Sequence, residues 1–98
     1  MDAKTATIEA ARLVSAERAR EQEVEGYTAE HDDQHTKGQL AMAAVAYALA
    51  STPNAGWASQ WWPWNPHGFK PKDPLTNLVM AAALIQSDIE RWLRAGDV

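Results

Sequence analysis

The stretch TKGQLAMAAVAYALA, residues 36–50, carries most of the information about the fold. Alanine, leucine and methionine favour helix, so the stretch predicts a helix over about residues 37–51. Thr36 and Gln39 have the spacing of a capping box, with Thr36 as the N-cap and Gln39 reaching back to it. Pro53 then stops the helix. Because this helix is apolar nearly all round, we expect it in the core or at an oligomer interface, where its alanines permit close packing.

A second helix is predicted upstream, over about residues 5–24, in a run rich in Ala, Glu, Arg and Gln. Steps of three and four residues place one line of side chains on a single face of this helix. The line begins apolar and becomes charged, and it consists of Ala6, Ala10, Leu13, Glu17, Arg20 and Val24. A charge on an inward face must be paired or line a cavity, because burying it alone is costly.

A third helix is predicted over about residues 74–95. Asp73 and Pro74 form an N-cap followed by proline at the first helical position, and Gly96 lies just past the last turn. Alternating steps of four and three define an apolar stripe on this helix, which we expect to face the core. The stripe consists of Leu78, Ala82, Ile85, Ile89 and Trp92.

The segment between the last two helices, residues 53–72, holds four of the five tryptophans and four of the five prolines. Its prolines disfavour a long helix or a central strand, whereas its aromatic surface should be buried rather than disordered. The fold class that follows is all-α. We expect residues 1–98 to form one domain, a three-helix antiparallel bundle with a long Trp/Pro-rich loop between its second and third helices.

The composition and net charge of the chain exclude or disfavour several classes of function. The chain of 98 residues has a net charge of −4 and no large basic patch, which disfavours nucleic-acid binding. It has no cysteine, so disulfides, thiolate metal sites and cysteine nucleophiles are excluded. No stretch resembles a signal peptide or a membrane span, and we expect a soluble cytoplasmic protein. Alanine-rich helix faces in so short a chain leave apolar surface over, which favours a homodimer.

Charged and aromatic residues suggest a ligand site. Glu17 and Arg20 continue the inward line of the first helix, and the aromatic loop supplies side chains that can stack on a flat ligand. Lysines beside the start of the third helix can hold an anionic group. The candidate ligand-binding residues are Glu17, Arg20, Glu21, Tyr27, Trp61, Trp62, Trp64, Lys70 and Lys72. The alternative is structural: the charges form ion pairs at the bundle edge, and the tryptophans cap a thin core or anchor a protein interface.

The stretch EHDDQH, residues 30–35, is a candidate metal site. Glu30, His31, Asp33 and His35 offer oxygen and imidazole donors, and a divalent ion such as Mg or Mn is the possible cofactor. The alternative is a polar collar, in which acids near a helix N-terminus are stabilised by the helix dipole and the histidines bond loop carbonyls. No nucleophile–base pattern and no glycine-rich phosphate loop is present, so no catalytic residue is assigned.

Several segments together resemble a group of small proteins carried by tailed phages and prophages. The segments that carry the resemblance are EGYTAEHDD at 25–33, HTKGQLAMAAVAYA at 35–48, WPW at 62–64, FKPKD at 69–73 and NLVMAAALIQSDIER at 77–91. The resemblance implies expression in the cytoplasm of a bacterial host. Phage proteins of this size often antagonise host defences, which would make the partner a host defence protein or a nucleotide-derived signal. A structural role in the phage particle is a further alternative.

A second similarity is to the all-α NTP pyrophosphohydrolases, which bind Mg through E-x-x-E and E-x-x-D pairs on facing helices. Glu30 and Asp33 match the E-x-x-D pair. The other pair is missing, because Glu17, Glu21 and Glu25 are spaced by four. This similarity implies, as the alternative function, a metal-dependent nucleotide hydrolase that would use Glu17, Glu21, Glu30, Asp33 and His35.

Overall fold

The protein is all-helical, as its sequence predicts. The computed structural model describes residues 1–96, and this part of the chain contains no β-strand. In chain order the elements are α1 (Ala3–Glu23), α2 (Ala29–Asp33), α3 (Gln39–Ala50), the 3₁₀ helices η1 (Ala55–Trp61) and η2 (Pro66–Gly68), and α4 (Pro74–Ala95). The described residues include no helix both long and apolar enough to cross a membrane.

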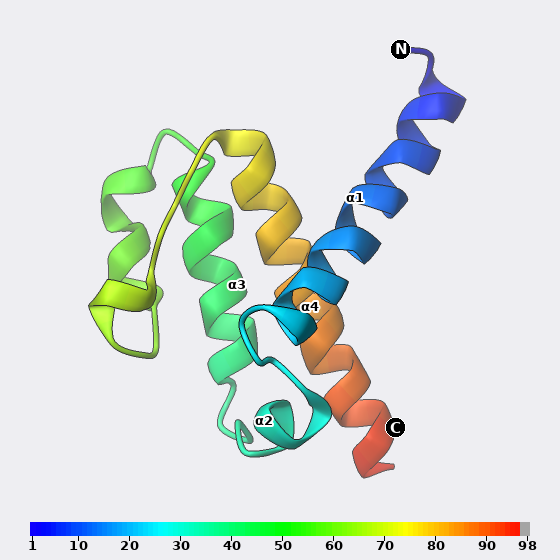
Figure 1. Cartoon of the computed structure of the whole chain (residues 1–98). Coiled ribbons are helices and arrows are strands. Elements are labelled where there is room, and N and C mark those ends of the chain that lie inside the picture. The colour runs from blue at the N-terminus through cyan, green and yellow to red at the C-terminus, as the bar shows by residue number, and fades with distance from the viewer. Residues whose placement is uncertain (97–98) are drawn as a thin grey trace.

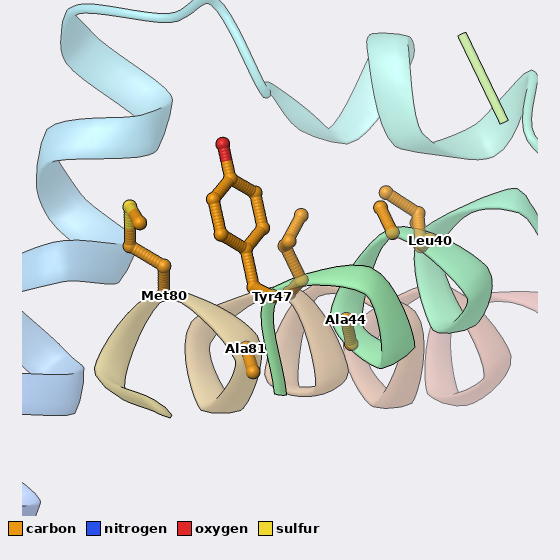
Figure 2. Close-up of a cluster of buried hydrophobic side chains, with 7 residues drawn as sticks. Leu40, Ala44, Tyr47, Met80 and Ala81 are labelled. Atoms are coloured by element: carbon orange, nitrogen blue, oxygen red, sulfur yellow. The ribbon is translucent and has the colours of Figure 1, made fainter. Parts of the chain in front are cut away.

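The core lies between α3 and α4, which form the largest contact between elements and run antiparallel (Figure 1). Leu40 and Leu84 are almost completely buried there. Ala43 and Ala83 have no exposed surface, so small side chains let the two helices approach closely. Figure 2 shows the ring of Tyr47 standing in this cluster beside Met80, with its hydroxyl group directed away from α3.

Helix α1 does not complete an antiparallel three-helix bundle. It crosses α4 and packs against it through its second half, while its first half projects from the body (Figure 1). Arg18 and Glu21 are its only fully buried side chains within the described chain, and Val24 is 71% exposed. The most buried positions of α1 therefore lie beside the predicted line, of which Leu13, Glu17 and Arg20 are partly buried.

The segment before α3 also differs from expectation. EHDDQH does not form a collar at the start of α3, because most of it belongs to the short helix α2, which was not predicted. The N-cap of α2 is Thr28, whose side chain accepts a hydrogen bond from the His31 backbone N–H at 3.3 Å. The capping box was wrong: Gly38, not Thr36, is the N-cap of α3, and its φ of +81° favours glycine. The Gln39 side chain instead accepts a bond from the Lys37 backbone N–H.

Helix α4 has its expected bounds, but a different face of the helix is turned toward the core. Asp73 caps its start and Gly96, with a φ of +73°, ends it. The predicted core stripe faces outward, and Leu78, Ile85, Ile89 and Trp92 are each about half exposed. The buried face instead mixes two large apolar residues with small and polar ones: Asn77, Met80, Ala81, Ala83, Leu84, Ser87 and Arg91. Its alanines lie against the alanine face of α3 and permit close approach, while Met80 and Leu84 fill the core beside them.

The aromatic loop packs along the side of α3, mainly through η1 (Figure 1). It is not wholly irregular, since η1 and η2 lie within it. Trp62, Trp64 and Phe69 are partly buried against the core, whereas Trp57 and Trp61 are 61% and 44% exposed. The loop therefore supplies part of the hydrophobic core that the alanine-rich helices lack.

Candidate functional site

A pocket of about 180 Å³ opens between the second half of α1, the helices α3 and α4, and the end of the aromatic loop. Charged and aromatic side chains line it together. The lining residues are Glu17, Arg20, Glu21, Glu25, Tyr27, Tyr47, Trp62, Gly68, Lys70, Lys72, Met80 and Leu84. A cavity near 150 Å³ accepts one benzene-sized ring, so this pocket encloses one ring-sized group and not a whole nucleotide.

Glu21 is the unusual residue of the pocket. Its side chain is 97% removed from solvent, and its Oε1 atom has no hydrogen-bond partner among the described residues. Burial, with the nearby Glu17 carboxylate as the next cause, raises the pKa of Glu21 to about 8. The carboxyl group is therefore mainly protonated at neutral pH. A buried polar atom without a partner is rare in a folded protein, and in a pocket it marks a place for a ligand atom.

Arg20 is held by carboxylates on either side. Its guanidinium group bonds Glu17 at 2.7 Å and Glu25 at 2.9 Å. These two ion pairs satisfy most of the arginine's charge, so Arg20 forms a fixed wall of the pocket and is not a free anion receptor. The same pairs keep both acidic side chains at the pocket edge.

Lys70 and Lys72, at the end of the aromatic loop, also line the pocket, and their backbone is anchored to the core. The Lys70 backbone N–H donates to the Tyr47 hydroxyl at 3.1 Å. Asn77 is completely buried and fixes Lys72 twice, accepting from its N–H at 2.6 Å and donating to its carbonyl at 3.0 Å. Within residues 1–96 neither ammonium group takes part in an ion pair.

An aromatic corner forms the apolar end of the pocket. The rings of Tyr47 and Trp62 meet edge to face, with centroids 5.6 Å apart, and Phe69 lies 5.0 Å from Tyr47. The Trp62 indole N–H donates to the Asn65 carbonyl at 2.9 Å, which fixes the ring. The corner is therefore preorganised and offers a flat ligand a rigid apolar surface.

A buried ion-pair cluster lies beyond the pocket and joins α1, α2 and α4. Arg18 bonds Asp32 at 3.0 Å, Glu90 at 2.9 Å and the Tyr27 carbonyl at 3.0 Å. The Arg18 side chain is 4% exposed and that of Asp32 is fully buried. The hydrogen bond from Arg18 lowers the pKa of Glu90. The cluster fixes the position of α1, and with it Glu17 and Glu21, against the rest of the molecule.

The two histidines of α2 and its following turn lie in an aromatic cluster. The His31 ring stacks on Tyr27 at 4.7 Å, and the His35 ring lies 5.0 Å from Trp64. His31 Nδ1 is 2.8 Å from an Asp32 oxygen, and the two Nε2 atoms are 3.4 Å apart. Burial, followed by the neighbouring His31, lowers the pKa of His35.

The four candidate metal ligands are not assembled into one site. Asp33 bonds Arg94 at 2.9 Å, and Glu30 is exposed, so only His31 and His35 approach each other. Over residues 1–96, no three His, Cys, Asp or Glu side chains are grouped so that they could hold a metal ion. Asp32, the fully buried carboxylate of this segment, binds Arg18.

The structure brings seven of the nine candidate ligand-binding residues to the pocket and leaves two elsewhere. Those at the pocket are Glu17, Arg20, Glu21, Tyr27, Trp62, Lys70 and Lys72. Trp61 is exposed on η1, and Trp64 packs in the histidine cluster.

Sequence reasoning missed Glu25 and Tyr47 at the pocket, and Arg18, Asp32 and Asn77 behind it. Tyr47 carried a signal, because a tyrosine in an otherwise apolar helix needs a partner for its hydroxyl group. Arg18 and Asp32 carried none, since they are 14 positions apart and only the fold pairs them.

No protein-family model matches this chain, and neither a curated protein nor a solved structure shows significant similarity to it.

Proposed function

We propose that this protein is a non-enzymatic binding protein that holds a nucleotide-like molecule in the pocket between α1, α3 and α4. The observation that carries the proposal is a buried carboxyl oxygen on Glu21 that has no partner among the described residues, in a pocket that Lys70 and Lys72 also line. Neither lysine takes part in an ion pair within residues 1–96, so both side chains are available to an anionic group at the pocket. The Glu21 carboxyl group suits the hydrogen-bonding edge of a ring, and the two lysines suit a phosphate.

The inner end of the pocket supports a single planar ring. Tyr47 and Trp62 offer apolar ring surfaces, and the volume of about 180 Å³ suits one base-sized group. A protonated carboxyl group both donates and accepts a hydrogen bond, so Glu21 at neutral pH matches a base edge on which an N–H lies beside an unprotonated ring nitrogen.

The charge balance of the pocket favours an anionic ligand. Arg20, Lys70 and Lys72 face the carboxylates of Glu17 and Glu25, with Glu21 mainly uncharged at neutral pH. With Glu21 protonated, three cationic residues and two carboxylates line the pocket, in a protein whose overall charge is −4. Because Arg20 is already paired, the two lysines are the groups that would meet a phosphate outside the enclosed ring.

The resemblance to small phage and prophage proteins supplies the biological setting. A protein without a catalytic constellation that binds a nucleotide-like signal in the cytoplasm of a bacterial host would lower the free concentration of that signal and so oppose a defence response. The alternative hydrolase would need its carboxylates around one metal ion. Glu17 and Glu21 line the pocket, whereas Asp33 bonds Arg94 and Glu30 is exposed on α2, and this separation favours binding without turnover.

The test is thermal unfolding of the pure protein against a panel of mononucleotides, cyclic dinucleotides and ADP-ribose derivatives, each with and without Mg or Mn. A ligand at 100 times its dissociation constant stabilises the folded state by about 2.7 kcal/mol, which raises the melting temperature of a domain this small by roughly 10 °C or more. A shift that needs no metal, without consumption of the nucleotide, is the expected result.

Two variants assign the shift to the pocket. Lys70→Ala combined with Lys72→Ala should abolish most of it, because the phosphate then has no cationic partner. The matched control, Lys4→Ala combined with Lys37→Ala, removes the same charge from exposed positions outside the pocket and should leave the shift unchanged. Equal loss in both double variants would show only a general charge effect. No shift with any nucleotide would overturn the proposal and favour a host protein as the partner.

A further inference from the structure

The outward face of α4 carries an apolar seam that the folded chain does not cover. Its large members, Leu75, Leu78, Ile85, Ile89 and Trp92, are 45–61% exposed. With Ala82 they alternate in steps of three and four residues along almost the whole helix, which is the a and d pattern of a coiled coil. We call these six residues the outer seam. A heptad pattern is typical of a helix that packs against another helix. Within residues 1–96 the only helix beside the seam is α1, which faces Leu75 and Leu78 across a groove and leaves them exposed.

A groove of about 370 Å³ adjoins the seam at the start of α4. Leu75 and Leu78 belong to both surfaces, and α1 forms the far wall of the groove through Ala6, Ala10, Leu13 and Val14. A 22-residue helix is roughly 33 Å long and about 10 Å wide with its side chains. The footprint of a partner helix along the seam alone is roughly 330 Å², below the about 800 Å² per partner of a specific interface, so a further contact in this groove is needed to approach that size.

The chain's own α4 meets this requirement when it lies antiparallel. That orientation sets the six seam residues in three kinds of layer, each formed twice: Leu75 with Trp92, Leu78 with Ile89, and Ala82 with Ile85 of the second copy. The small Ala82 then faces a large side chain. At each end of this helix pair, the indole of Trp92 of one copy then lies against Leu75 of the other copy, at the edge of the groove. A parallel pair would instead set the two smallest side chains, Ala82 and Ala82, and the two largest, Trp92 and Trp92, against each other.

The charges beside the seam permit self-association. The flanking e and g positions of the heptads are Val79, Ala81, Gln86, Asp88, Leu93 and Ala95. Asp88 is the only charged residue among them, and it is already bonded to Arg91 at 2.9 Å. Two copies therefore bring no unpaired like charges together. Flanking positions without free charges also offer nothing to attract a strongly charged partner.

From these observations we infer that the outer seam is the interface of a homodimer in which two α4 helices pack antiparallel and each copy places Trp92 at the groove between α1 and α4 of the other. The pocket of the proposed function lies on the buried side of α4, so dimer formation leaves it open in both copies. The inference stands independently of any ligand.

Sedimentation equilibrium over a concentration series tests the dimer. The unmodified protein should show the mass of two chains, and Ile85→Asp should reduce it to one chain while keeping its helical circular dichroism, because position 85 is half exposed in the monomer. Ile8→Asp is the matched control, at a site 64% exposed and outside both surfaces, and should remain dimeric. A single-chain mass for the unmodified protein up to millimolar concentration overturns the proposal, as does a dimer that survives Ile85→Asp.

Orientation is tested by disulfide formation, which the absence of native cysteine makes specific. A mixture of an Ala82→Cys chain and an Ile85→Cys chain should form the mixed disulfide faster than either chain links to itself. Preferential self-linking of Ala82→Cys would indicate a parallel pair and contradict the antiparallel seam.

Discussion

Glu21 connects the candidate pocket to the stability of the fold. Its pKa is about 8 in the folded protein, chiefly through burial, and near 4.5 in the unfolded chain. Between these values the folded state binds the proton more tightly, so the contribution of Glu21 to the free energy of unfolding falls as pH rises from about 4.5 to 8. The residue is thus retained at a cost to stability in neutral and alkaline solution, which is consistent with a role in binding.

Glu21→Gln should remove this pH dependence. The variant should gain stability relative to the unmodified protein as pH rises, by on the order of 3 kcal/mol between pH 5 and pH 8. Urea denaturation at both pH values measures the difference. Glu23→Gln, an exposed change on the same helix, serves as the control and should leave the pH dependence as it was. Parallel stability curves for Glu21→Gln and the unmodified protein would contradict the buried, protonated carboxyl group.

At the scale of elements, Arg18 of α1 binds a carboxylate on α2 and another on α4, and Arg94 of α4 binds a second carboxylate on α2. Asp32 is fully buried and pairs with Arg18, whereas the neighbouring Asp33 is half exposed and pairs with Arg94. Asp32→Ala removes the fully buried partner of Arg18 and leaves the partly exposed Glu90 as its remaining carboxylate partner. Breaking a buried pair costs up to about 3–5 kcal/mol, while an exposed pair contributes at most about 1 kcal/mol.

We therefore expect Asp32→Ala to destabilise the protein strongly and Asp33→Ala to change it little. The two substitutions delete the same group at adjacent positions, so each serves as the control for the other. The measurement is the urea midpoint at pH 7. Similar small losses for both would mean that the Arg18 cluster does not hold α2 in place.

At the scale of the whole molecule, the loop and the helix pair share one core. Trp62, Trp64 and Phe69 pack against Leu40, Tyr47 and Leu84, so the aromatic segment should unfold together with α3 and α4. Tryptophan fluorescence should report mainly the loop, and far-ultraviolet circular dichroism the helices.

Leu84→Ala should shift both transitions together to lower temperature. The side chain is 2% exposed, and its truncation should cost about 2–5 kcal/mol, a large part of the stability of a domain this size. Leu93→Ala, on the same helix but 60% exposed, should change the melting temperature far less when measured at low protein concentration. Separate fluorescence and dichroism transitions in the unmodified protein would show that the loop is not part of the cooperative unit.

Local signals in the sequence determined most of the helices. Asp73, Pro74 and Gly96 define the ends of α4 because capping and backbone preferences act within one turn. The composition of residues 39–50 was enough to predict α3, although its capping box was misread, since Gly38 takes the left-handed conformation that a helix start here requires. Helix α2 is five residues long, too short for a periodic pattern, and only Thr28 marked it.

The tertiary structure alone decided which surfaces face inward. A 4-3-4-3 apolar stripe identifies a helix face that packs on something, but it does not say whether that partner lies within the chain. The alanine face of α3 accepts only a close neighbour, so α4 turns Ala81, Ala83 and Leu84 inward and leaves Ile85, Ile89 and Trp92 outside. The pocket likewise brings together residues of α1, α3, α4 and the aromatic loop, and the bonds of Arg18 to Asp32 and Glu90 that hold α1 against α2 and α4 are long-range pairings without a counterpart in local sequence.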